Sequence, residues 1–75
     1  MLAYVQIALE NASEVDVKDQ LKGFPEVRDV HILFGEWDLM VKLELESPEA
    51  LAAFVMDHIR PIEGVKLTST LIVAK

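Results

Sequence analysis

The sequence contains no cysteine, only three glycines and three prolines, and a single tryptophan. The absence of cysteine excludes disulfide bonds and any metal site built from thiolates. It also fits a cytoplasmic protein, because structural disulfides belong to oxidising compartments. The two histidines, His31 and His58, are far apart in the sequence and do not form a ligand-spaced pair. We therefore expect no metal and no cofactor.

Basic residues are scarce. The chain has 7 lysines and arginines against 13 acidic residues, which gives a net charge of −6 and a pI of about 4.7. A domain that binds nucleic acid on its own usually carries a basic patch and a high pI. The composition therefore argues against direct DNA or RNA binding.

Long hydrophobic runs are also missing. The longest, Ala50 to Met56, is far shorter than the roughly 20 residues that a membrane helix needs. The first ten residues, MLAYVQIALE, have neither the basic region nor the cleavage site of a signal peptide. We therefore expect a cytoplasmic chain that does not contact a membrane.

What remains is a short and strongly apolar chain. It has 75 residues, of which 52% are hydrophobic, enough for one domain over residues 1–75. A domain of this size buries only about 60–65% of the surface that its unfolded chain exposes. Much apolar surface would stay uncovered in a monomer, which indicates self-association.

Alternating polarity predicts strands over residues 2–9, 27–34, 39–45 and 65–73. In the first strand, one face carries Ala3, Val5, Ile7 and Leu9. In the third, one face carries Leu39, Val41, Leu43 and Leu45. In the last, Val65, Leu67, Leu71 and Val73 are expected on the core face, and Lys66, Thr68, Thr70 and Ile72 on the other.

Two helix starts are visible. Ser13 precedes a stripe made of Val17, Leu21 and Phe24, and Gly23 fits the left-handed position after a helix end. The second start is Ser47-Pro48-Glu49, with a capping serine and a proline in the first helical position. Its buried stripe consists of Leu51, Phe54, Val55 and Ile59. Arg60-Pro61 should end this helix.

Two turns complete the pattern. Gly35-Glu36 suits a two-residue type II′ hairpin, and Glu63-Gly64 turns the chain into the last strand. The order β-α-β-β-α-β predicts an α+β, ferredoxin-like fold: a four-stranded antiparallel sheet with both helices on one face. Strands one and three should be central. A second copy would cover the open face, giving a dimeric α+β barrel; the residues expected on that face are Tyr4, Gln6, Met40, Thr68, Thr70 and Ile72.

Three segments, FGEWDLMVKLEL, SPEALAAFV and IEGVKLTSTLIV, together resemble the ligand-binding domain of the Lrp/AsnC family of regulators. This module is also called the regulation-of-amino-acid-metabolism (RAM) domain. Its pattern combines a Gly-x-aromatic-Asp start to the third strand with a Gly-Val and threonines on the fourth. The matching residues are Gly35, Trp37, Asp38, Gly64, Val65, Thr68 and Thr70, and the resemblance covers essentially the whole chain.

The resemblance implies a regulatory module rather than an enzyme. It implies a face-to-face dimer, dimers joined into a ring such as an octamer, and a free amino acid bound between neighbouring dimers near the second hairpin. Family members typically carry a DNA-binding helix-turn-helix domain before this module. Because the sequence starts directly at the first strand, we expect a stand-alone form that modulates a full-length Lrp/AsnC regulator of amino-acid metabolism.

The expected effector site follows the needs of a free amino acid. Gly35 would let a ligand approach the backbone, Asp38 would accept from its ammonium group, and hydroxyls would bind its carboxylate. The effector-binding residues that we predict are Gly35, Glu36, Trp37, Asp38, Thr68, Ser69 and Thr70. The predicted interface residues are Tyr4, Phe34, Met40 and Ile72.

Each of these residues also has a purely structural interpretation. Gly35 serves a turn, Trp37 suits an interface, Asp38 can bond local backbone amides, and the three hydroxyl residues are good strand formers. Phe34 and Trp37 also depart from the small or polar residue and the tyrosine that are usual in the family. Both would reshape the cleft.

Three other functions stay open. The chain could be an oligomerisation or partner-binding module with an empty cleft, as Phe34 suggests. It could be a small dimeric-barrel enzyme, for which His31 is the only candidate base on a strand. An amino-acid sensor of the ACT type has the same element order, but the Gly-x-aromatic-Asp hairpin and the threonines of the last strand favour Lrp/AsnC.

Overall fold

The order of elements is the one that the sequence predicts. A computed structural model describes residues 1–75, and its strands are β1 (Leu2–Leu9), β2 (Val27–Ile32), β3 (Leu39–Glu44) and β4 (Val65–Ile72). The helices are α1 (Glu14–Lys22) and α2 (Pro48–Phe54), and α2 continues into a π-helical turn, η1 (Val55–Ile59).

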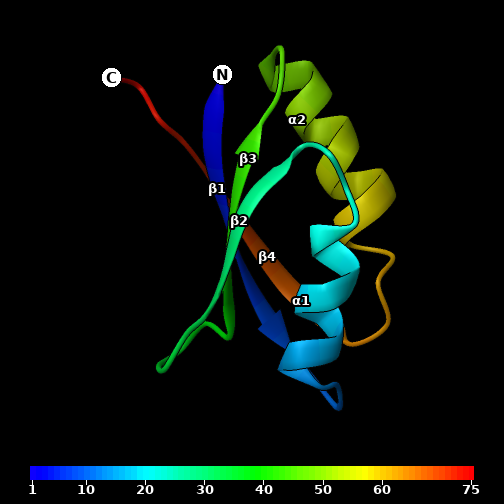
Figure 1. Cartoon of the computed structure of the whole chain (residues 1–75). Helices are drawn as coiled ribbons and strands as arrows, with labels where there is room; N and C mark the ends of the chain where they lie inside the picture. The colour runs from blue at the N-terminus through cyan, green and yellow to red at the C-terminus, as the bar shows by residue number, and fades with distance from the viewer.

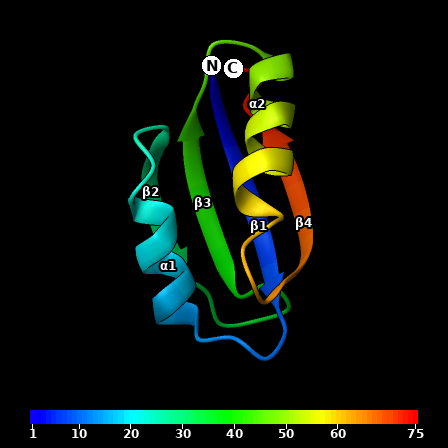
Figure 2. The same cartoon turned by 90° about the vertical axis from the view of Figure 1, so that its right-hand side faces the viewer.

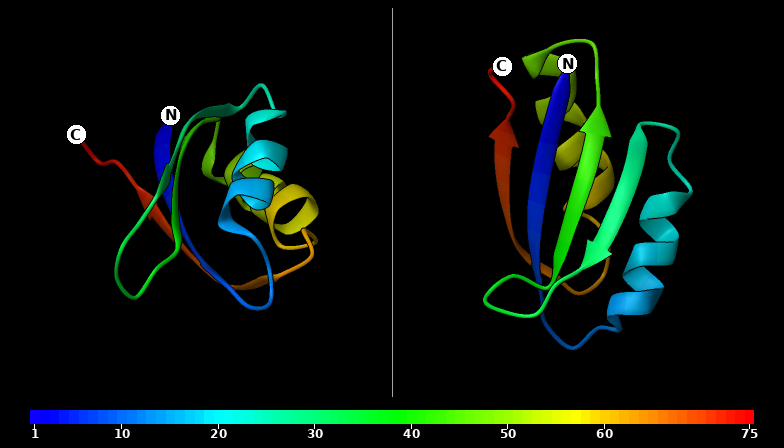
Figure 3. Two further views of the ribbon diagram at one scale, coloured as in Figure 1. Left: turned by 60° about the horizontal axis from the view of Figure 1, so that its bottom comes forward. Right: turned by 60° about the vertical axis from the view of Figure 1, so that its left-hand side comes forward.

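The four strands form one antiparallel sheet in the order β2-β3-β1-β4. Both helices lie on the same face of this sheet, with α1 beside β2 and α2 over β1 and β4 (Figures 1 and 2). The α+β ferredoxin-like fold and the central position of β1 and β3 are confirmed. The opposite face, called the open face below, carries no helix (Figure 3, right). No helix is long and apolar enough to cross a membrane.

The core lies between the helices and the two central strands. All thirteen buried residues are apolar. On β1 they are Ala3, Val5 and Ile7, and on β3 they are Leu39, Val41 and Leu43. These are the faces that the alternation predicts, because a central strand beneath the helices must turn its apolar side toward them.

Both predicted helix caps are present. The Ser13 hydroxyl accepts from the Asp16 N–H at 3.3 Å, and the Ser47 hydroxyl accepts from the Ala50 N–H at 3.1 Å. The prediction for Gly23 is wrong: its φ is −73°, in the right-handed region. The second helix ends before Arg60-Pro61 as predicted, although its last turn is a π turn in which the Arg60 N–H donates to the Val55 carbonyl at 2.8 Å.

The predicted faces of β4 are wrong over most of its length. Residues opposite one another in an antiparallel pair share a face of the sheet. Thr68, Thr70 and Ile72 lie opposite Ile7, Val5 and Ala3, which are buried under the helices. Leu67 and Leu71 therefore lie on the open face, opposite Ala8 and Tyr4. Only Val65 packs against the core as predicted, because a register shift opposite Ala8/Leu9 changes the alternation there.

The open face is consequently more apolar on one side than on the other. Its β1 and β4 half carries Leu2, Tyr4, Ala8, Leu67 and Leu71, together with Gln6 and Ser69. Its β2 and β3 half carries Met40 and the charged or titratable residues Asp29, His31, Lys42 and Glu44. As a single chain, the protein exposes large apolar side chains where a monomer usually has polar ones.

Candidate functional site

The β2–β3 connection, which carries four of the predicted effector-binding residues, is a longer loop than predicted. It spans residues 33–38 and is closed by the Leu33 N–H, which donates to the Asp38 carbonyl at 2.8 Å. The prediction of a two-residue turn at Gly35-Glu36 is therefore wrong. The Asp38 N–H donates instead to the Ile7 carbonyl at 2.9 Å, so the loop is tied to β1 as well as closed on itself.

The tip of this loop is free of the rest of the chain. It projects on the open-face side, away from both helices (Figure 1; Figure 3, left). Gly35 has a φ of +155°, and a Cβ built on it would meet nothing within 4 Å. The N–H groups of residues 34–37 make no hydrogen bond within the chain. The tip thus presents unused backbone donors of the kind that bind carboxylates.

The Asp38 carboxylate has a hydrogen-bond partner within the chain, on a residue far away in the sequence. Its Oδ2 accepts from the Leu9 N–H at 2.7 Å, beside the register shift at Ala8/Leu9. The side chain therefore replaces a missing ladder bond at the end of β1. No partner within the chain uses the other carboxylate oxygen, Oδ1. Asp38 can hold the loop to β1 and still accept from a ligand.

Removing the Asp38 acceptor should destabilise the fold. We expect Asp38→Ala to lower the free energy of unfolding by about 1–3 kcal/mol, because the Leu9 N–H loses a charged partner. Asp38→Asn should cost clearly less, since an amide oxygen can still accept. Urea denaturation at one fixed chain concentration measures both variants. Equal losses for Ala and Asn would contradict this role.

The three predicted site residues on β4 do not act on one surface. Thr68 and Thr70 lie on the helix face, whereas Ser69 lies on the open face opposite Gln6. Asp38 and Thr68 are on either side of Ile7, a separation of roughly 10 Å at ordinary strand spacing. Within one chain, the loop and the threonines are therefore separated by the sheet.

The threonines line a groove that the sequence patterns do not indicate. It lies between the second helix and β4, has a volume of about 390 Å³, and is lined by Pro48, Leu51, Ala52, Val55, Met56, Arg60, Thr68, Thr70 and Ile72. One signal could have revealed it. The run from Ala50 to Met56 is apolar all round, which is typical of a helix covered on more than one side.

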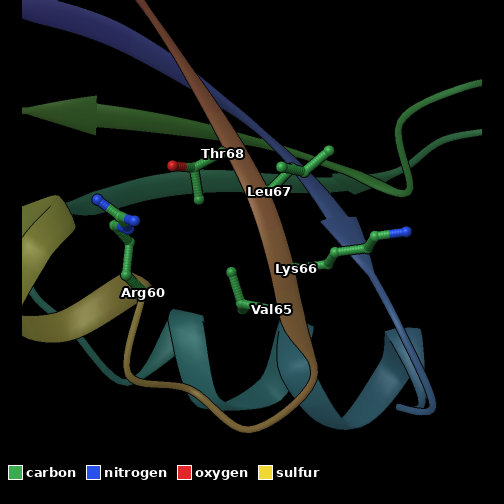
Figure 4. A pocket seen from close by; sticks show the side chains of 5 residues that line it. All are labelled: Arg60, Val65, Lys66, Leu67 and Thr68. Atoms are coloured by element: carbon green, nitrogen blue, oxygen red, sulfur yellow. The ribbon is translucent and has the colours of Figure 1, made fainter.

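Arg60 lies where this groove meets a second cavity of about 280 Å³ at the start of β4. The side chains of Arg60 and Thr68 point toward one another, while Lys66 and Leu67 point to the other side of the strand (Figure 4). The Arg60 guanidinium makes no ion pair. Its only hydrogen bond within the chain is a weak one, in which Nη1 donates to the Met56 sulfur at 3.8 Å. A free cation therefore stands at the end of an apolar groove.

The remaining candidates are spread over the molecule. Tyr4 and Met40 lie on the open face, Phe34 is at the loop tip, and Ile72 is at the outer edge of the sheet on the helix face. The Nε2 of His31 lies 3.1 Å from the Oδ2 of Asp29, and His31 lines none of the cavities. His58 packs against the rings of Phe24 and Phe54.

Comparison with known proteins identifies the family of this chain. The family model of the Lrp/AsnC ligand binding domain matches residues 2–75. The HTH-type transcriptional regulator FL11 of Pyrococcus furiosus is 33% identical over all 75 residues, which cover 49% of that protein. A homocitrate synthase of Sulfurisphaera tokodaii is 32% identical over 65 residues, which amount to 14% of the enzyme. The chain spans less than half of the length of the curated regulators that it matches.

Solved structures agree. The chain resembles FFRP-DM1 with a TM-score of 0.90 and 30% identity, and the match covers 96% of each chain. The transcriptional regulator NMB0573 of Neisseria meningitidis, solved as a complex with L-Met, shares the fold with a TM-score of 0.85 and 23% identity; the match covers 99% of this chain and 49% of the regulator. The chain belongs to the Lrp/AsnC family, of whose regulators it represents the ligand-binding domain.

Proposed function

We propose that this chain is a non-catalytic regulatory module that binds a free amino acid at the boundary between copies of itself. The observation that carries the proposal is the match of residues 2–75 to a ligand-binding domain. A structural relative in complex with L-Met supports the ligand class.

The loop offers what the polar end of an amino acid needs. The free N–H groups at residues 34–37 would donate to the α-carboxylate. The unused Oδ1 of Asp38 would accept from the α-ammonium group in a charge-assisted hydrogen bond. The half-buried Trp37 would supply an apolar wall. Thr68 and Thr70 of the neighbouring copy would add hydroxyls, whereas Ser69, which lies on the open face, would not take part.

A site between copies fits this arrangement better than a site within one chain. The loop projects into open space on one side of the sheet (Figure 1), and Thr68 and Thr70 face the other side. A second copy can bring its own β4 to the loop, which the same chain cannot do. The apolar open face gives the copies a reason to associate.

Calorimetric titration with each of the common amino acids tests this function. We expect saturable binding of at least one of them. Asp38→Asn should weaken that binding at least about tenfold, because a charged hydrogen bond becomes a neutral one. The stability of the variant should change little, because the bond to Leu9 remains. Asp19→Asn removes an exposed acid on α1 and is the matched control, with unchanged affinity.

No saturable heat with any amino acid would overturn the ligand and leave an assembly module. Binding that is equally strong in Asp38→Asn would retain the ligand but remove Asp38 from its site. A change of the same size in Asp19→Asn would mean that net charge, rather than a contact, controls the affinity.

One observation favours a second candidate. A segment of a homocitrate synthase resembles this chain over 65 residues, which supports a module that works beside an enzyme. The module would then transmit the amino-acid signal to a catalytic partner. Pull-down with a full-length Lrp/AsnC regulator distinguishes the two candidate functions, because the transcriptional role requires co-assembly with that regulator.

For the transcriptional role we propose a cytoplasmic homo-oligomer built from dimers, such as an octameric ring.

A further inference from the structure

We propose that the tip of the β2–β3 loop docks into the groove between the second helix and β4 of another copy, with Phe34 as its anchor. The inference concerns how copies recognise one another, and it holds whether or not an amino acid binds. It differs from association through the open face, because neither the loop tip nor the groove is part of that face.

Phe34 has the properties of an anchor that lacks its pocket. Its exposure is 108% of the reference value, so no atom of its own chain shields it. It stands on a projecting loop, next to a glycine with open space around it. Interfaces concentrate their binding energy in aromatic residues seated in apolar pockets. A phenylalanine held in water by a short loop is a candidate for such a residue.

The groove has the matching shape and chemistry. Its volume of about 390 Å³ exceeds that of one side chain, so it can accept the ring and part of the loop backbone. The surfaces next to the ring would be Leu51, Ala52, Val55 and Met56 on the helix and Ile72 on β4. Met56 and Ile72 are largely exposed in the single chain, so docking would cover both. Methionine adapts easily to an inserted ring.

Charge selects the loop as the occupant. Glu36 follows Phe34 by two residues and makes no ion pair. Arg60 lies at the end of the groove and is also unpaired. Two copies that each carry a net charge of −6 repel one another, and opposite charges that meet at a contact offset part of this repulsion. With Phe34 seated, the Glu36 carboxylate would lie near the Arg60 guanidinium and could form a bidentate pair.

The contact must join different copies. The loop projects from the open-face side of the sheet, whereas the groove lies between the helical layer and the outer strand (Figures 1 and 2). Docking would also carry the free N–H groups of the loop toward Thr68 and Thr70 of the other copy. The two halves of the proposed effector site, separate in one chain, would then face each other.

Cysteine cross-linking tests the contact directly, because the chain has no cysteine of its own. Glu36→Cys, an exposed loop position that leaves Phe34 in place, and Met56→Cys are prepared separately, mixed in equal amounts so that subunits exchange, and treated with a short bis-maleimide. We expect the mixed cross-linked dimer to dominate over both symmetric ones, as judged by mass spectrometry. Val15→Cys, an exposed apolar position on α1, replaces Met56→Cys in the control and should give little mixed product. Equal yields with both partners would overturn the proposal.

A charge exchange tests the same contact in the unmodified assembly. Phe34→Ala, Glu36→Arg and Arg60→Glu should each raise the concentration at which the assembly dissociates at least about tenfold. The double variant Glu36→Arg/Arg60→Glu should recover most of this loss, as sedimentation velocity would show. Three unaffected single variants, or a double variant weaker than both singles, would contradict the docking. Neither readout requires a bound amino acid, so each stays independent of the effector titration.

Discussion

Leu71→Lys should dissociate the assembly at concentrations where the wild-type chain remains associated. Leu71 lies on the open face opposite Tyr4, at the apolar end of that face. Burying a lysine there against a second sheet would leave its charge without a partner, which costs at least about 2 kcal/mol, or roughly thirtyfold in the dissociation constant. Sedimentation equilibrium over a range of concentrations measures the change.

The same substitution should leave the folded single chain almost unaffected. Leu71 is on an edge strand and is about half exposed, and lysine is well tolerated at such positions. Val15→Lys, also at an exposed apolar position, is the control and should not change the assembly. If Leu71→Lys associates as strongly as the wild type, a second copy does not cover the open face.

Gly64→Ala should be the most damaging of the three possible glycine-to-alanine substitutions. Gly64 turns the chain into β4 with a φ of +95°, and an added Cβ would overlap the Cβ of Ala12. The left-handed backbone costs an alanine about 1 kcal/mol, and overpacking adds about 1–3 kcal/mol. The total of about 3 kcal/mol is a large part of the stability of a domain this small. Thermal and urea unfolding both measure it.

Gly23 provides the matched control. Its φ of −73° suits any residue, and an added Cβ would come no closer than 3.3 Å to the Gln20 carbonyl oxygen. Gly23→Ala should therefore change the stability by no more than about 1 kcal/mol. An equal loss of stability in Gly64→Ala and Gly23→Ala would mean that the backbone conformation of Gly64 does not cause the destabilisation.

Much of this fold could be predicted from the sequence, because its central strands and helix starts obey local rules. Val5 and Val41 face the helices as their alternation requires, since both strands are covered on one side by the core. Ser13 and Ser47 each cap a helix through the N–H three residues further on. These features depend on neighbours in the sequence and on one apolar layer.

The faces of β4 could not be predicted in the same way. A period of two shows that one face is more apolar, but it does not show which layer covers that face. Leu67 and Leu71 look like core residues, yet they lie on the open face. Thr68 and Thr70 look like residues of the open face, yet they lie on the helix face and line the groove. The inner side of β4, an edge strand beside a short helix, stays partly open. An apolar open face has the same sequence pattern as a core face.

The sequence suggests residues for a candidate site but does not show how they are arranged. The sequence indicates Gly35, Asp38 and Thr68, but the structure places the loop and the threonines apart. Asp38 turns out to bond the backbone of β1, 29 residues away along the chain, which no local pattern reveals. No sequence pattern marks Arg60 as a residue of the groove, because a single basic residue beside a proline has no distinctive spacing.

Native mass spectrometry of the wild-type chain, mixed with a pool of the common amino acids, tests the central claim in one spectrum. It reports the number of copies and the mass of any bound ligand for each species. If the site forms only between copies, an amino acid will be bound to oligomers, and monomers in the same spectrum will carry none. Oligomers without ligand, or monomers that bind it as well as oligomers do, would contradict the account.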